Sequence, residues 1–133
     1  TTRFEVCASQ AALITVVLVD TSVWIDFFRR GGRLARLLEE NRALVHPFVI
    51  GELACGYLED RNNILGYLRD LPMMNTATDE EVLCFIDNRD LAGCGVGYLD
   101  MHLLASVQLY GHAKLWTKDK KLAALAGKLA LSN

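Results

Sequence analysis

The chain lacks the residue patterns of a metal–thiolate protein, a disulfide scaffold or a disordered segment. Its 133 residues include four cysteines and only two prolines. The cysteines form no Cys-x-x-Cys pair, which excludes zinc-ribbon spacing and a disulfide framework. We expect them to be small core residues in a reducing compartment. Hydrophobic residues make up 52% of the chain and charged residues 23%, a composition that favours one globular domain.

Strong charge and long apolar runs are missing as well. The formal net charge of −2 gives no overall attraction for a polyanion. Arginines cluster within residues 29–36 and lysines within 118–121, and the simplest interpretation of either cluster is a solvated face. The apolar run at 11–19 is far too short to span a bilayer. We therefore expect a cytoplasmic protein with no membrane segment. Residues 1–10 show no clear pattern, and residues 1–15 are interpreted as an N-terminal extension, either a tag remnant or a frayed arm.

The stretch 16–26 organises the remainder of the chain. Four apolar residues, Val16 to Val19, run directly into Asp20, which predicts a strand buried on both faces of a parallel sheet. Ligands of open α/β sheets bind outside the carboxyl ends of the strands, where Asp20 falls. Ser22 is expected to cap the following helix. The alternative for Asp20 is that it only caps this helix and does no chemistry.

Strand and helix patterns alternate along the chain. Helices are predicted at 22–30, 33–41, from Pro47 through Leu58, at 63–70, from Thr78, at 98–110 and at 120–126. Short strands are predicted at 43–46, 71–76, 113–117 and 129–131. This alternation predicts an α/β fold with a parallel sheet. Thr78 and Glu81 have the spacing of a helix capping box.

Four acids share a position in this pattern. Asp20 and Asp119 follow predicted strands, while Glu52 and Asp100 are expected in the first turns of helices. Strand ends and the starts of following helices lie on one rim of a parallel sheet, so the four carboxylates can converge. Two carboxylates 4 Å apart repel by about 4 kcal/mol at an effective dielectric of 20. Convergence therefore implies raised pKa values or a bound divalent cation, and oxygen ligands favour Mg²⁺ or Mn²⁺ over zinc.

The three histidines are not expected to join this site. His102 is two residues from Asp100 on the same helix, a spacing that turns the two side chains apart. His46 and His112 lie near element ends and are interpreted as structural.

Four segments in order resemble the motifs of PIN-domain nucleases, and in particular VapC-type toxins. They are Val-Leu-Val-Asp-Thr-Ser-Val-Trp-Ile-Asp at 17–26, Ile-Gly-Glu-Leu-Ala at 50–54, Gly-Tyr-Leu-Asp-Met-His-Leu-Leu-Ala at 97–105 and Leu-Trp-Thr-Lys-Asp-Lys-Lys-Leu at 115–122. The resemblance implies a PIN domain over 16–133, with a small, mostly parallel central sheet flanked by helices on both faces. The extension 1–15 is a departure, since this family usually begins near its first strand.

The resemblance also implies an activity and a site. It implies a metal-dependent endoribonuclease, the toxin of a bacterial toxin–antitoxin pair, that hydrolyses RNA phosphodiester bonds with a water activated by Mg²⁺ or Mn²⁺. Its catalytic metal ligands map onto Asp20, Glu52, Asp100 and Asp119. Ser22 and Thr117 match hydroxyl positions that support the site. The implied partners are RNA, a second copy of the chain in a homodimer, and an antitoxin that blocks the acidic pocket.

Two other functions stay open at this point. A metal-dependent phosphatase on an α/β sheet usually carries Asp-x-Asp after its first strand, whereas Ser22 stands two residues after Asp20. A non-catalytic partner-binding module of PIN type would have lost some of the acids, whereas all four are present.

Overall fold

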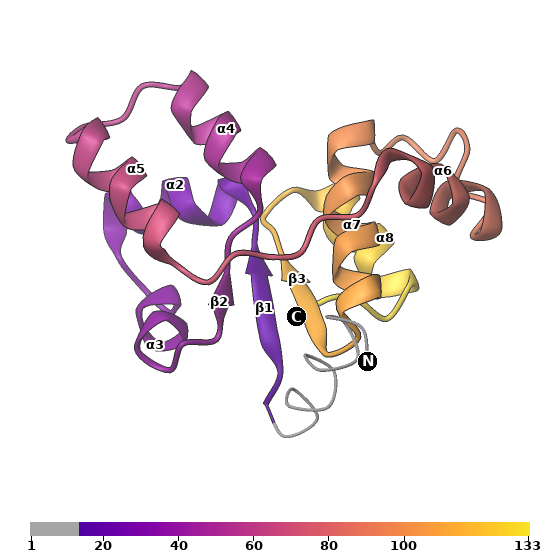
Figure 1. Ribbon diagram of the computed structural model, residues 1–133, viewed down its shortest axis with the longest axis horizontal. Coiled ribbons are helices and arrows are strands. Elements are labelled where there is room, and N and C mark those ends of the chain that lie inside the picture. Colours follow the sequence, from indigo (N-terminus) through magenta and orange to yellow (C-terminus); the bar gives the residue numbers. More distant parts are fainter. Residues whose placement is uncertain (1–13) are drawn as a thin grey trace.

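The computed structural model describes residues 14–133, so nearly all of the expected extension, and Cys7, lie outside the described residues. Three strands are present in this part of the chain: β1 (Val16–Val19), β2 (Ala43–Leu44) and β3 (Ala113–Trp116). Seven helices accompany them (Figure 1): α2 (Thr21–Arg30), α3 (Leu34–Glu39), α4 (Pro47–Cys55), α5 (Arg61–Asp70), α6 (Asp79–Asn88), α7 (Tyr98–Tyr110) and α8 (Lys120–Lys128).

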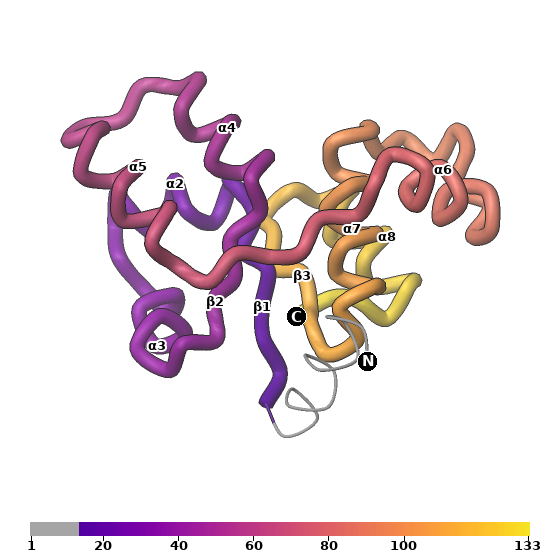
Figure 2. Tube along the Cα trace, in the orientation of Figure 1, coloured from indigo at the N-terminus to yellow at the C-terminus, as the bar shows by residue number. Residues whose placement is uncertain are grey.

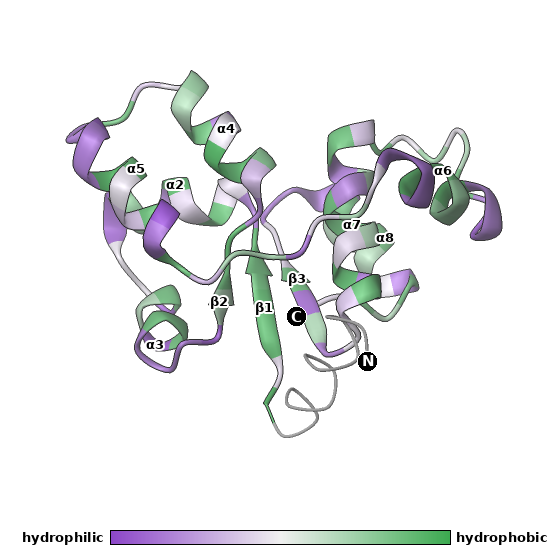
Figure 3. Cartoon of the chain, viewed as in Figure 1, coloured by the Kyte–Doolittle hydropathy of each residue, from purple (hydrophilic) through white to green (hydrophobic). Residues whose placement is uncertain are grey.

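The strands form one parallel sheet in the order β2-β1-β3. Val17 pairs with Ala43 on one side of β1, and Val19 pairs with Trp116 on the other. Val17, Leu18 and Val19 are 0% exposed, and the whole strand is coloured as hydrophobic in Figure 3. Successive strand side chains point to opposite faces, so both faces of β1 are covered. The predicted α/β fold with a parallel sheet is confirmed.

Helices flank the sheet on two sides. In Figure 1, α2 to α5 lie beside β2, and α6 to α8 lie beside β3. All three strands point the same way, so their carboxyl ends share one end of the molecule. Helix α2 follows β1 and helix α8 follows β3. The starts of these two helices therefore lie at the same end of the molecule as the carboxyl ends of the strands.

Two predicted strands are wrong. Residues 71–76 make only one bridge, between Val45 and Met73, because Pro72 has no N–H and offers only its carbonyl, which accepts from the Val45 N–H at 3.0 Å. The segment 71–78 instead connects α5 to α6, as Figure 2 shows. At the end of the chain α8 continues to Lys128, and only a bridge between Leu115 and Ser132 follows it.

Of the other local predictions, some are confirmed and some are wrong. Helix α7 has the predicted bounds, and the Thr78–Glu81 capping box is present. Helix α4 ends at Cys55 rather than Leu58, which leaves Tyr57 92% exposed. The prediction that the cysteines are core residues is wrong for the three that the structure describes, because Cys55, Cys84 and Cys94 are free and exposed. None of the helices within 14–133 has the length and apolarity needed to cross a bilayer.

Candidate active site

Asp20 stands at the carboxyl end of β1, where the sequence places it. Its backbone is extended, and its N–H donates to the Trp116 carbonyl at 3.0 Å, which continues the pairing of β1 with β3 by one residue. The side chain is 6% exposed. It makes no capping hydrogen bond to α2, which contradicts the alternative that Asp20 serves only as a helix cap.

Two hydroxyl groups hold the Asp20 carboxylate. The Thr117 hydroxyl donates to Oδ2 of Asp20 at 2.7 Å, and the Ser22 hydroxyl donates to the same oxygen at 3.1 Å. The prediction that Ser22 caps α2 is wrong, because Ser22 lies inside the helix and its Oγ accepts from the Lys118 N–H at 3.0 Å. Thr117 Oγ1 accepts in turn from the Asp119 N–H at 3.0 Å. These bonds fasten the end of β1 to the segment after β3.

Glu52 lies on α4, which begins with Pro47 in its first turn. Glu52 is the sixth residue of α4, in the second turn and not in the first as expected. Its Oε1 accepts a hydrogen bond from the Thr21 hydroxyl at 2.9 Å. Thr21 was not among the residues predicted to act here, although its place beside Asp20 in the Asp-Thr-Ser triplet was the available signal. Helix α4 is thereby tied to the start of α2.

Asp119 and Asp100 complete a set of four acids at the carboxyl end of the sheet. We call Asp20, Glu52, Asp100 and Asp119 the acidic rim. Asp119 is the N-cap of α8, and its Oδ1 accepts from the Leu122 N–H at 3.0 Å. Asp100 lies in the first turn of α7. Burial raises the pKa of the Asp100 carboxyl to about 6, and the nearby charges of Asp20, Glu52 and Asp119 add to this rise. The structure therefore brings the four predicted acids within electrostatic reach of one another.

The carboxylates surround a site without closing it. Within residues 14–133, no three His, Cys, Asp or Glu side chains stand close enough together to form a finished metal-binding group. Asp20, Glu52 and Asp119 each have one oxygen engaged by the protein. Their second oxygens have no hydrogen bond within the described part of the chain. One oxygen of each is therefore available to a cation.

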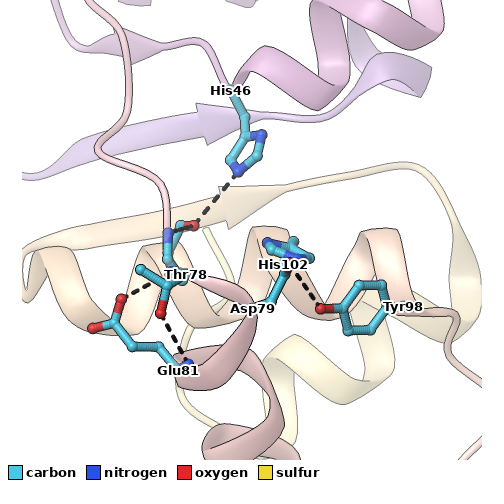
Figure 4. Close-up of polar contacts among 8 residues, drawn as sticks. His46, Thr78, Asp79, Glu81, Tyr98 and His102 are labelled. Carbon is cyan, nitrogen blue, oxygen red and sulfur yellow. Dashed lines mark hydrogen bonds and ion pairs between the residues drawn. The ribbon is translucent and has the colours of Figure 1, made fainter.

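A second cluster of polar residues fixes the start of α7 (Figure 4). Asp79 Oδ1 accepts from the Tyr98 hydroxyl at 3.0 Å and lies 3.0 Å from His102 Nε2. Asp79 opens α6, whose N-terminus carries the Thr78–Glu81 capping box. His102 was expected to point away from Asp100, and its side chain contacts Asp79 instead. Asp79 and Tyr98 were missed, because the motif at 97–105 that contains Tyr98 indicated a role only for Asp100, and Asp79 lies in a capping box that indicated only the start of a helix.

Comparison with known proteins places this arrangement in a family. The model of the PIN domain family matches residues 17–128, which include all four acids. The chain belongs to the PIN-domain family. Ribonuclease VapC32 from each of two strains of Mycobacterium tuberculosis is 46% identical to this PIN-domain protein over 110 residues, which are 82% of the chain and 89% of the relative. The resemblance to VapC-type proteins expected from the motifs is confirmed.

Proposed function

We propose that this PIN-domain protein is a metal-dependent endoribonuclease and the toxin of a bacterial toxin–antitoxin pair. The observation that carries the proposal is the acidic rim, in which three neighbouring carboxylates help to raise the pKa of Asp100 to about 6. The ribonuclease name of its 46%-identical relatives supports RNA as the substrate.

The donor set fits a hard divalent cation. Carboxylate oxygens are the ligands that Mg²⁺ and Mn²⁺ prefer, and a cation relieves the repulsion that opposes ionisation of Asp100. We assign the cation to Asp20, Glu52, Asp100 and Asp119. When bound, it neutralises the phosphate charge and supplies a water of lowered pKa.

The chain's own residues hold these ligands in place. The Thr117 and Ser22 hydroxyls fix the position of the Asp20 carboxylate by donating to Oδ2. Thr21 does the same for Oε1 of Glu52. Asp100 is ionised at neutral pH, because its pKa of about 6 lies below 7. Such supporting hydrogen bonds reduce the reorganisation that the site must undergo during the reaction.

An antitoxin can reach Glu52 from an adjoining cavity of about 680 Å³ between α2, α4 and α5. Apolar Ile25, Leu53 and Ile64 line it, and Glu52 belongs to its wall. These features support an antitoxin segment that places apolar side chains in the cavity and a positive charge beside the acids.

The homodimer and the cytoplasmic location stay predictions. Light scattering after gel filtration tests the homodimer.

Cleavage of total cellular RNA by the antitoxin-free protein tests the proposal. The reaction is run with Mn²⁺, Mg²⁺ or EDTA, and the new ends are mapped. A few sharp cuts are expected with metal, with none in EDTA and none from Asp20→Asn. Asp87→Asn, which changes an acid on α6 outside the rim, is the matched control and should cut like the wild type. Metal-independent cuts, or cuts that persist in Asp20→Asn, would contradict the proposal.

A further inference from the structure

A second cavity of about 310 Å³ lies beside the acidic rim, between the end of α2 and the end of β3. Trp116 forms one wall and Arg33 another, and Asp26 and Lys118 contribute to the lining. The turn 31–32 belongs to the lining, with Gly31 at φ +66° and Gly32 at φ +129°. A Cβ at either glycine would meet no atom within 4 Å, so open space adjoins the turn.

Arg33 and Trp116 form a cation–π pair in the wall of this cavity. The Arg33 guanidinium carbon lies 4.6 Å from the centroid of the Trp116 ring. Trp116 is partly buried, while Arg33 is exposed. Unstacked RNA bases bind on aromatic rings and on arginine planes. The Arg33–Trp116 cation–π pair borders open space and therefore offers a surface for a nucleobase.

The cavity also has an excess of positive charge. Asp26 Oδ2 lies 3.1 Å from Lys118 Nζ, and Asp26 Oδ1 lies 3.2 Å from Arg30 Nε. The Lys118 hydrogen bond holds the pKa of Asp26 below its ordinary value, against the effect of burial. Arg33 and Lys118 line the cavity against the single carboxylate of Asp26, so the lining carries a net positive charge in a chain whose net charge is −2. The Lys118 side chain is still 50% exposed, so it can meet an anion from solvent.

The cavity is joined to the acids by three residues of chain. Trp116 accepts the Asp20 N–H through its carbonyl, and the Lys118 N–H donates to Ser22 Oγ, which also binds Asp20. The backbone from Trp116 to Asp119 spans at most about 10 Å. Stacked nucleotides of one strand are about 3.4 Å apart. A nucleotide in the cavity thus lies within a few positions of a phosphate at the acidic rim.

We propose that this cavity is a subsite for one nucleotide of single-stranded RNA beside the scissile phosphate. The base stacks on the Arg33–Trp116 pair, and Lys118 exchanges Asp26 for a backbone phosphate. This inference rests on the proposed ribonuclease function. An acidic protein segment is the other anion that could enter, but it would gain little from the face of Trp116, so the aromatic wall favours RNA.

Binding of a fluorescein-labelled 12-nucleotide single-stranded RNA, measured by anisotropy in EDTA, tests the subsite without cleavage. Trp116→Leu and Arg33→Gln are expected to weaken binding by about fivefold or more, the lower limit for loss of one base stack. Lys118→Gln should weaken binding and reduce the dependence on salt by about one phosphate contact. Asp26→Asn should tighten binding, because Lys118 and Arg30 lose their competing carboxylate.

Matched controls separate the cavity from general effects. Tyr67→Leu removes an exposed aromatic on α5, and Lys128→Gln removes a lysine from the last turn of α8; both should bind RNA like the wild type. RNA should also quench the fluorescence of Trp116, with the fully buried Trp24 as an internal reference, and Trp116→Phe should abolish the quench. Melting temperatures confirm that each variant is folded.

The outcomes distinguish the two proposals. Wild-type affinity in Trp116→Leu and Arg33→Gln would overturn the subsite, even if these variants lost affinity for an acidic peptide. A wild type that binds RNA through the cavity yet makes no metal-dependent cuts would contradict the ribonuclease proposal alone. A wild type without measurable affinity for RNA in EDTA would overturn the subsite, whereas the ribonuclease proposal is decided by the cleavage assay with metal.

Discussion

The Thr117 hydroxyl donates a 2.7 Å hydrogen bond to Oδ2 of Asp20, a residue 97 positions earlier in the chain. The same hydroxyl oxygen accepts from the Asp119 N–H. One side chain thus sets the positions of two acids that reach the rim from different strands. The effect of Thr117 on activity should therefore exceed that of an ordinary surface threonine.

Thr117→Val keeps the shape of the side chain and removes both hydrogen bonds. We expect cleavage and metal affinity to fall about 10- to 100-fold, the range found when a group that orients a metal ligand is lost. Stability should fall by about 1–3 kcal/mol, because partly buried polar groups lose their partner. Thr117→Ser retains the hydroxyl and should stay near the wild type. Kinetics with a mapped RNA site measure the effect, and equal activity of the two variants would rule out this role.

Asp100→Asn should stabilise the metal-free protein at pH 7.5. The folded-state pKa of about 6 lies above the ordinary aspartate value of 3.8, so the folded state binds more protons than the unfolded state within this interval. Wild-type stability therefore falls as pH rises from 3.8 through 6. The full shift corresponds to about 3 kcal/mol, which solvent screening of the half-buried group reduces to about 1 kcal/mol. Urea unfolding in EDTA measures it, and the gain of the variant should vanish near pH 3.5.

A divalent metal should reverse the loss of wild-type stability that accompanies ionisation of Asp100. Mn²⁺ at 100 times its dissociation constant is expected to stabilise the wild type by about 2.7 kcal/mol, seen as a rise in melting temperature. Asp20→Asn and Asp100→Asn should lose the rise, while Asp87→Asn should keep it. Because protons compete for Asp100, the apparent affinity for Mn²⁺ should weaken as pH falls below about 6. A rise of equal size in all the variants would place metal binding elsewhere.

His46 should make the fold sensitive to acid. It is 0% exposed, and burial lowers its pKa from 6.5 to about 4, with a smaller contribution from His102. The unfolded state binds more protons between these values, so stability is lost as pH falls from 6.5 through 4, by up to about 3 kcal/mol. His46 is the N-cap of α4, and its Nδ1 accepts from the Phe48 N–H at 3.0 Å. His46→Asn can keep this bond and should flatten the slope even if its overall stability is lower. The difference between the two unfolding profiles isolates the contribution of His46, and parallel profiles would refute it.

The sequence predicted the site better than the contacts that support it. Val16 to Val19 could only be a strand covered on both faces, and this placed Asp20. The bounds of α7 followed from its apolar pattern and from the glycines on either side, and these placed Asp100. Both predictions rest on local patterns that the rest of the fold does not alter.

The errors have a different origin. Ser22 has the chemistry of a helix cap; the motif resemblance implied that its hydroxyl supports the site, but its bonds to Asp20 and Lys118 depend on the approach of the segment after β3. Residues 71–76 have the apolar content of a strand, but Pro72 limits their pairing to one bridge. Thr21 contacts Glu52 across 31 residues, and no local spacing indicates which face of α4 will meet α2. Long-range packing decides each of these cases.

The order β2-β1-β3 also has a consequence for synthesis on the ribosome. Strand β1 is made early and pairs first with β2, whereas its other neighbour, β3, is completed only at Trp116. Chains emerge at about 5–20 residues per second, so β1 waits several seconds with one edge unpaired. During that interval Asp20 lacks Thr117, and the rim lacks Asp119. The nascent protein therefore cannot assemble its acidic centre beside the ribosome's own RNA until nearly all of the described chain has been made.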